Sequence, residues 1–156
     1  MKRDRQRAKQ KDIVSAIEAE AWEDIRTMLA SQPGLHRYII ARLYETDAAQ
    51  MERTLRSFEI IAETFERERL LDLARRLLWM LNDESGNHCP NSALAMAHIA
   101  RVHYQVIEPH IPVMRFHATD PGDRMAAICQ EALDMIEKWR GSDQMEQGSD
   151  GERGIQ

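Results

Sequence analysis

Histidine and cysteine side chains, which supply metal ligands and nucleophiles, are concentrated in one part of this sequence. Five of the six histidines and one of the two cysteines fall between positions 88 and 117, namely His88, Cys89, His98, His103, His110 and His117. Their spacing does not match a compact site, because side chains five residues apart on a helix diverge by roughly 140°. The HExxH, ExxH and CxxC patterns are absent. The one nucleus for a metal site is the adjacent pair His88 and Cys89, with Asp83 or Glu84 as further ligands.

The same adjacent pair is the only candidate for cysteine-based catalysis, since a cysteine nucleophile is activated by a nearby base. Neighbours in sequence rarely have the geometry of a working pair. There is also no GxSxG motif, no glycine-rich phosphate loop and no dinucleotide fingerprint. We therefore expect no bound metal and no cofactor. A metal-dependent or cysteine-based enzyme centred on His88 and Cys89 is the alternative to a binding function.

The run NDESGNH at positions 82–88 is the densest stretch of short polar side chains in the chain. Such residues end one helix and cap the next, and loops beside rigid helices commonly take part in recognition. The two uses are compatible, because capping occupies only one or two of these side chains. The residues predicted to bind a partner are Asp83, Glu84, Asn87 and His88, with Arg75 and Arg76 as weaker candidates.

Other charged, methionine and tryptophan side chains have ordinary structural interpretations. Glu59, Glu63 and Glu66 follow one helix edge, which is typical of a solvated face that Arg56 and Arg67 neutralise. Methionines lie on or beside most of the apolar stripes, where filling the core is the default and a Met-rich groove for partner helices is the alternative. The tryptophans, Trp22, Trp79 and Trp139, are expected to be packing residues.

Apolar residues recur at intervals of three and four along most of the chain, which is the pattern of helices with one buried face. Only 7 Gly and 5 Pro interrupt it. Pro33-Gly34 must end the first helix, and Thr46-Asp47 supplies a cap for the third. The helix at 90–104 is apolar nearly all round, so neighbours should bury it on two sides. The expected helices cover 13–30, 35–44, 48–65, 66–81, 90–104, 109–118 and 121–140, which predicts an all-α fold.

A polar helix start recurs at a nearly constant interval. Asp47, Asp83 and Asp120 are separated by 36 and 37 residues, and a period in that range indicates stacked units. Each unit would be a helix pair that buries its apolar face against the next pair. The sequence therefore predicts a right-handed α-α superhelix of about three and a half pairs, in which the helix at 121–140 caps the end.

Two segments of the chain resemble HEAT-like or armadillo-type helical repeats: ETDAAQMERTLRSFEIIAETF at 45–65 and TDPGDRMAAICQEALDMI at 119–136. The stretch ARRLLWMLNDESG at 74–86 is also similar to a segment of small bacterial HEAT-like repeat proteins. In those proteins a Pro-Glu pair follows, whereas this chain continues NHCPNSALAMAHI and lacks the acid. The resemblance covers roughly 35–137. It implies a HEAT-like solenoid and brings no catalytic residues.

The net charge of −5 is distributed unevenly. Residues 1–11 contain six bases and one acid, a charge of +5, so the remainder has a charge of −10. We predict a basic flexible arm at 1–12, a repeat domain at 13–140 and a disordered tail at 141–156. An acidic body repels nucleic acid and anionic membrane, so nucleic acid is expected only through the basic arm.

The remaining sequence features concern the compartment and the class of protein. No apolar run approaches the roughly 18 to 20 residues of a membrane helix, and the two cysteines have no disulfide spacing. We therefore expect a cytoplasmic protein that does not contact a membrane. The predicted function is a non-enzymatic protein–protein interaction or scaffold module, which binds another protein through its helical-repeat surface and the connector at 82–88.

Overall fold

The computed structural model describes residues 1–44, 47–82, 88–120, 122 and 124–152, and every regular element among them is a helix. The predicted all-α fold is confirmed. In chain order the elements are α1 (Lys2–Glu18), α2 (Trp22–Ser31), η1 (Pro33–Leu35), α3 (His36–Ala41), η2 (Arg42–Tyr44), α4 (Ala48–Thr64), α5 (Arg67–Leu81), α6 (Asn91–Val102), α7 (Tyr104–Ile107), η3 (Glu108–His110), α8 (Ile111–Ala118) and α9 (Arg124–Glu152).

The prediction of one helix over 13–30 is wrong, because the chain turns between α1 and α2. Glu20 adopts a left-handed conformation with a φ of 55°. Its N–H donates to Ile17 O at 3.1 Å, and the Ala21 N–H donates to Ala16 O at 2.9 Å. This pair of hydrogen bonds is the Schellman motif that ends many helices, here without the usual glycine. Apolar spacing continues across the turn, so periodicity alone did not reveal it.

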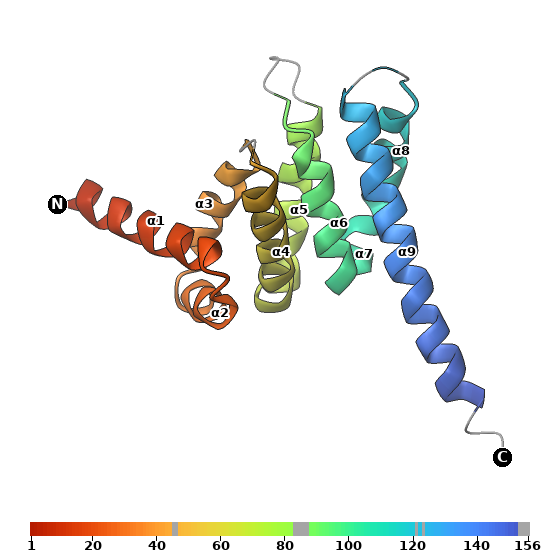
Figure 1. The fold of residues 1–156 in the computed structure, drawn as a ribbon, viewed down its shortest axis with the longest axis horizontal. Helices are drawn as coiled ribbons and strands as arrows, with labels where there is room; N and C mark the ends of the chain where they lie inside the picture. The colour runs from red at the N-terminus through yellow and green to blue at the C-terminus, as the bar shows by residue number, and fades with distance from the viewer. Residues whose placement is uncertain (45–46, 83–87, 121, 123, 153–156) are drawn as a thin grey trace.

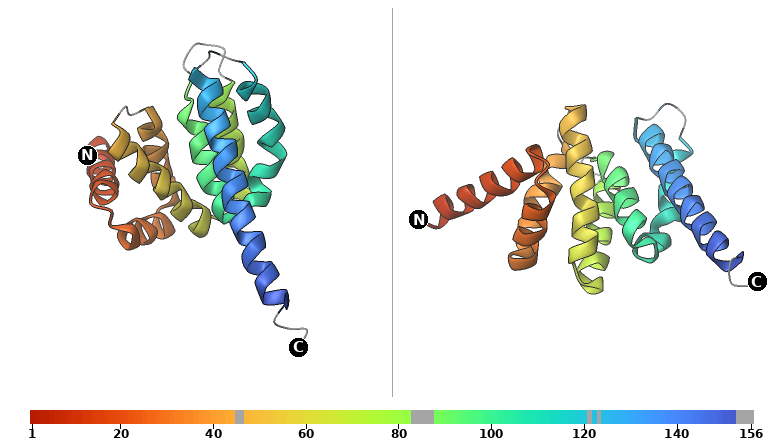
Figure 2. Two further views of the ribbon diagram at one scale, coloured as in Figure 1. Left: turned by 45° about the vertical axis from the view of Figure 1, so that its right-hand side comes forward. Right: turned by 60° about the horizontal axis from the view of Figure 1, so that its bottom comes forward.

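Both ends of the chain contain more helix than the sequence predicts. The basic residues expected to form a flexible arm at 1–12 are the first turns of α1, and they are exposed. The buried residues of α1 are Ile13, Ala16 and Ile17. At the other end, α9 continues through Glu152, past the predicted tail start at 141. Figure 2 shows the last part of α9 extending beyond the neighbouring helices.

The predicted helices at 48–65 and 66–81 are present as α4 and α5. As expected, Asp47 caps α4: its Oδ1 accepts hydrogen bonds from the N–H groups of Ala49, at 2.9 Å, and Gln50, at 3.2 Å. The expected helix at 109–118 is present as α8, which begins at Ile111 and has Pro112 in its first turn, where the missing N–H costs nothing. The short helices α7 and η3 precede it.

Helix α6 lies at the centre of the fold. It packs against α4, α5, α7 and α9, and its side chains are buried almost all round, as the sequence predicts. The buried residues are Ser92, Ala93, Leu94, Ala95, Met96, Ala97, Ile99 and Ala100. The four alanines and the serine among them allow neighbouring helices to approach closely. The surrounding helices all pack on α6, and the burial of its apolar surface stabilises this arrangement.

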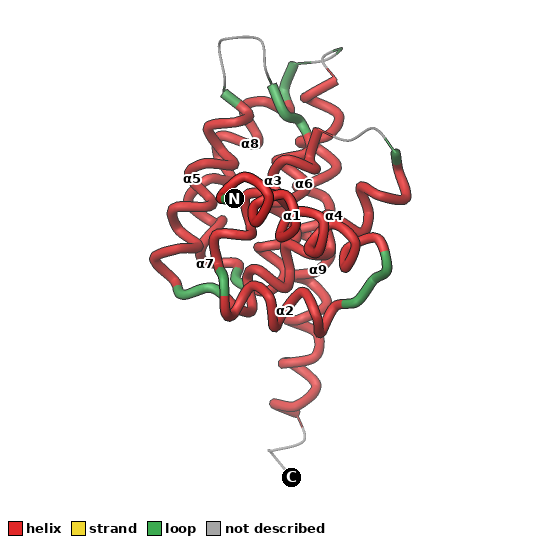
Figure 3. The backbone as a smooth tube through the Cα atoms, turned by 90° about the vertical axis from the view of Figure 1, so that its left-hand side faces the viewer, coloured by secondary structure: helices red, strands yellow, loops and turns green. Residues whose placement is uncertain are grey.

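The helices follow one another across the molecule in chain order, from α1 at one end to α9 at the other (Figure 1). Helices α4, α6 and α9 lie side by side and run in the same direction (Figure 1). Contacts join α2 to α4, α4 to α6 and α6 to α9, whereas α5 packs on the side of α6 that is turned away from this row. Figure 3 shows the assembly along its length, with connections at both ends of the helices.

Candidate functional site

The structure leaves most of the predicted connector site untested. Asp83, Glu84 and Asn87 lie outside the described residues. His88, which lies three residues before the start of α6, is exposed. Asn82 ends α5, and His117 Nε2 donates to its Oδ1 at 2.5 Å. The described part of the connector is thus fixed to α8 at one side and to α6 at the other.

The environment of Cys89 does not suit nucleophilic attack or metal binding by its thiol. Its side chain is buried, and its thiol donates to Leu43 O at 3.6 Å. Asn91 Nδ2 donates to the same carbonyl at 3.0 Å. Burial raises the pKa of the Cys89 thiol to about 11, so the thiolate needed for nucleophilic attack or metal binding is scarce at neutral pH. Among the residues that the structure describes, no group of three or more His, Cys, Asp and Glu is placed to hold a metal ion.

The weaker candidates Arg75 and Arg76 lie on the exposed side of α5. Arg75 Nη1 is 2.9 Å from Asp72 Oδ1, and both side chains are more than two-thirds exposed. Arg75 is therefore a solvated residue that pairs with a carboxylate of its own helix. Trp79 lies one turn further along α5 and is 67% exposed, so the prediction that it packs in the core is wrong.

A large open groove runs along the row of α4, α6 and α9. Its volume is about 940 Å³. Helices α4 and α9 both pack on α6, so α6 forms the floor and the other two helices form the walls. The lining residues are Ala48, Met51, Glu52, Leu55, Arg56 and Glu59 from α4, Leu94, His98, Arg101 and Val102 from α6, and Glu131, Met135 and Trp139 from α9.

Four side chains link the three groove helices at one end of the groove. His98 Nδ1 donates to Glu59 Oε2 at 2.8 Å, and Arg101 Nη1 is 3.5 Å from Glu59 Oε1. The Arg101 guanidinium carbon lies 4.6 Å from the centroid of the Trp139 ring, and the His98 ring meets the same indole edge-on at 5.2 Å. The side chains of His98 and Glu59 are only 13% and 19% exposed.

This cluster corrects the interpretation of Glu59 as part of a solvated edge. Its partners are His98 and Arg101 of α6, and not Arg56 or Arg67, which are close to it in sequence. A carboxylate partly withdrawn from water requires such charge-assisted hydrogen bonds. In the sequence, His98 is only one member of the histidine-rich stretch at 88–117, and nothing in the helical spacing indicated that Glu59 and Trp139 lie beside it.

The rest of the groove lining is apolar and accessible to different degrees. Met51, Leu55 and Leu94 are less than 10% exposed, whereas Val102 is 37% exposed and Met135 and Trp139 are half-buried. Two methionines thus line the groove, which is consistent with the Met-rich groove that the sequence left as an alternative. Arg56 is exposed at the groove wall, where its guanidinium carbon lies 4.8 Å from the centroid of the Trp22 ring.

Two smaller hollows lie elsewhere. One, of about 490 Å³, is between α8 and α9, where the Arg140 guanidinium carbon lies 3.7 Å from the centroid of the Tyr104 ring. The other, of about 460 Å³, lies beside His36 and the first half of α5. Burial lowers the pKa of His36, and Arg76 acts in the same direction. The second hollow has a mainly charged rim, formed by Glu66, Glu68, Arg69, Asp72 and Arg76.

Comparison with known proteins gives no match, since no family model, no curated protein and no solved structure is significantly similar to this chain. The resemblance to HEAT-like repeats therefore stays a prediction. No helix within the described part of the chain is both long enough and apolar enough to cross a membrane.

Proposed function

We propose that this protein is a non-enzymatic protein-binding or scaffold module, built as a HEAT-like right-handed helical repeat, which holds a segment of another protein in the groove of α4, α6 and α9. The observation that supports this most is the groove itself. It is open to solvent, and it combines apolar side chains with arginine and tryptophan, which are residue types that dominate the binding energy at protein interfaces.

A peptide fits this surface better than a reacting small molecule does. The acid-base pair in the groove, Glu59 with His98, is engaged with itself and with Arg101. Cys89, the residue on which an enzyme would depend, is buried as a protonated thiol. A cysteine-based enzyme is therefore not our proposal. Both cysteines are buried and outside any disulfide, which supports the proposed cytoplasmic location.

The connector at 82–88 is proposed as a second part of the binding surface. Its described flanks are Asn82 at the end of α5 and His88 just before α6, beside the end of the groove at which Leu94 lies. We propose that a partner held in the groove is also recognised by Asp83 and Glu84. Nucleic acid remains a proposal only for the basic surface of the first turns of α1.

Capture of partners from a native lysate, followed by direct binding of the purified partner, tests the groove. The variant Val102→Lys places a charge on an exposed floor residue, and Phe116→Lys makes the same change on α8, where the phenylalanine is 75% exposed. We expect Val102→Lys to weaken binding of that partner by at least about tenfold, and Phe116→Lys to leave it unchanged. Equal binding by the wild type and both variants would exclude the groove as the binding site.

Replacing Asp83 and Glu84 together with alanine tests the connector. Partner binding should weaken because two acceptors are lost, while the melting temperature should stay within a few degrees of the wild-type value if these side chains serve recognition and not capping. Binding is measured with the same purified partner, and melting by circular dichroism. A large fall in melting temperature would show instead that these residues are needed as helix caps.

A further inference from the structure

The groove has two ends with different charge, and the parallel direction of its helices defines them. At one end, His98 contacts both Glu59 and Trp139, so the three residues lie at about one level. Because α4, α6 and α9 run the same way (Figure 1), residues earlier in each helix lie toward the other end. Glu52 and Glu131 precede Glu59 and Trp139 by seven and eight residues, which places them roughly 10 to 12 Å away along the groove.

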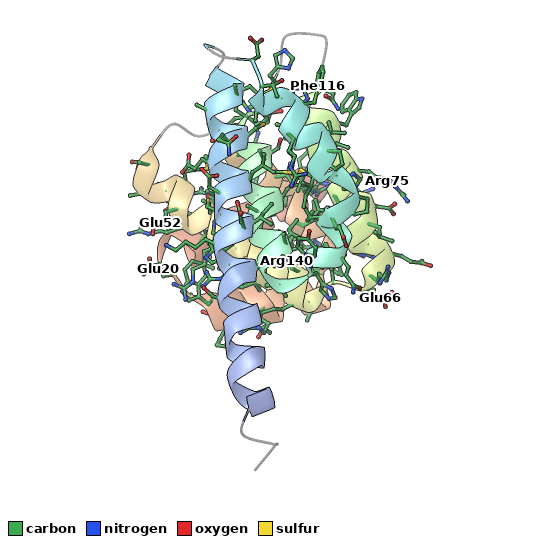
Figure 4. All side chains as sticks on the ribbon, turned by 90° about the vertical axis from the view of Figure 1, so that its right-hand side faces the viewer. Glu20, Glu52, Glu66, Arg75, Phe116 and Arg140 are labelled. Carbon is green, nitrogen blue, oxygen red and sulfur yellow. The ribbon has the colours of Figure 1, made fainter. Side chains whose placement is uncertain are left out.

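The end marked by Glu52 and Glu131 is acidic. Both carboxylates are exposed, one on each wall, and no ion pair joins either to another described residue. Figure 4 shows Glu52 pointing outward beside α4. The other half of the groove is basic: Arg101 lies at the level of Glu59, the single carboxylate there, which also accepts a hydrogen bond from His98. Arg56 lies between the two levels, four residues after Glu52 and three before Glu59.

The walls of the groove favour a helical occupant over an extended one. All three groove elements are helices, whose backbone N–H and C=O groups are paired within each helix. An extended peptide would find no sheet edge to continue its hydrogen bonds, whereas a helix satisfies its own backbone groups and presents only side chains. The roughly 10 to 12 Å between the two levels corresponds to about two turns of a bound helix.

The charges also select an orientation. Helices favour acidic residues in their first turn and basic residues in their last turn, because of the helix dipole. Such a helix meets Arg56 and Arg101 with its acids, and Glu52 and Glu131 with its bases, only if it lies antiparallel to α4, α6 and α9. These interactions join full side-chain charges. They outweigh the interactions of the groove with the roughly half charges that the dipole places at the two ends of the partner helix.

We propose that the groove binds a short amphipathic helix with an acidic first turn and a basic last turn, docked antiparallel to α4, α6 and α9. This inference rests on the proposed protein-binding function of the groove. It specifies the class of partner segment: apolar side chains on one face contact Met135, Leu55 and Val102, and opposite charges at its two ends fix the direction.

The experiment compares two hydrocarbon-stapled peptides of identical composition and identical leucine anchors, one with acids first and bases last and one with that order reversed. Stapling is needed because free helices this short are marginally stable. Fluorescence anisotropy on the full-length protein should show the acid-first peptide binding about tenfold more tightly at low salt, with a smaller difference at high salt.

A charge-reversed groove provides the decisive variant. In Glu52→Lys/Arg56→Glu/Glu131→Lys the preference should invert, so that the reversed peptide binds more tightly. The matched control Arg115→Glu/Glu137→Lys changes exposed charges beside the hollow between α8 and α9 and should keep the wild-type preference. A nitroxide on the last turn of the acid-first peptide should broaden the amide signals of Glu52 and Glu131 more than the Trp139 indole signal.

The remaining outcomes separate this inference from the proposed function. Equal affinity for the two peptides, with both lost in Val102→Lys, would overturn the polarity while supporting the groove as a binding site. Failure of both peptides to bind would overturn the helical occupant, and the capture experiment with Val102→Lys would still decide the proposed function. Broadening centred on Trp139 would show a parallel helix and overturn the orientation.

Discussion

The groove face and the exposed face of α5 contain similar residues but use them in different ways. On the groove face, Glu59 joins α4 to α6 and is only 19% exposed, and Arg101 continues the link to Trp139 on α9. On the face of α5, Asp72 pairs with Arg75 one turn away and both are exposed. Figure 4 shows Arg75 and Glu52 on opposite sides of the molecule.

The difference shows that position relative to neighbouring helices, rather than residue type, decides what a charged pair does. An exposed pair within one helix contributes little to stability, because water competes for both partners and salt screens them. A half-buried carboxylate between helices must be paired, and its removal leaves other polar groups unsatisfied. Two comparisons of matched substitutions and one pH dependence test how the position of a side chain decides its effect.

The largest expected effect comes from a buried and an exposed phenylalanine. Phe58 on α4 is fully buried and Phe116 on α8 is 75% exposed. Phe58→Ala should lower the free energy of unfolding by about 3 to 5 kcal/mol, because it removes apolar contacts and leaves a cavity. Phe116→Ala should change it by less than about 0.5 kcal/mol. Urea unfolding at fixed protein concentration measures both, and similar losses would contradict the assigned burial.

A smaller effect is expected for the two carboxylates. Glu59→Gln removes the negative charge shared by His98 and Arg101, and should cost about 1 to 2 kcal/mol of unfolding free energy. Asp72→Asn removes an exposed pair and should cost at most about 0.5 kcal/mol. The difference should persist at high salt, since partly buried pairs are screened less. Equal costs would show that Glu59 does not link the helices in solution.

The smallest expected effect is a pH dependence from the histidines beside the arginines of α5. Burial lowers the pKa of His36 and of His110, with Arg76 and Arg75 respectively acting in the same direction. The unfolded chain, with a histidine pKa of about 6.5, then binds more protons than the folded chain below that pH. Stability should therefore be full above about pH 6.5 and fall as the pH drops toward the lowered pKa values. Urea unfolding at several pH values should show a flatter profile in the double variant His36→Asn/His110→Asn.

Local patterns predicted much of this fold correctly. The bounds of α4 and α5, the cap at Asp47 and the burial of α6 on several sides all follow from interactions within a few residues of sequence or from the apolar content of one helix. The break at Glu20 was missed although it is local. Its apolar spacing continues through the turn, and the left-handed residue is a glutamate instead of the glycine that usually signals it.

The sequence by itself determined that this chain forms helices with apolar faces, and where several of them begin and end. The tertiary structure alone decided which side chains meet: Glu59 and His98 are 39 residues apart in sequence, and Trp139 is a further 41 from His98. It also decided that Cys89 is buried and Trp79 exposed. The physical reason is that helical periodicity depends on the chain's own next turn, whereas the groove depends on how three helices distant in sequence pack on one another.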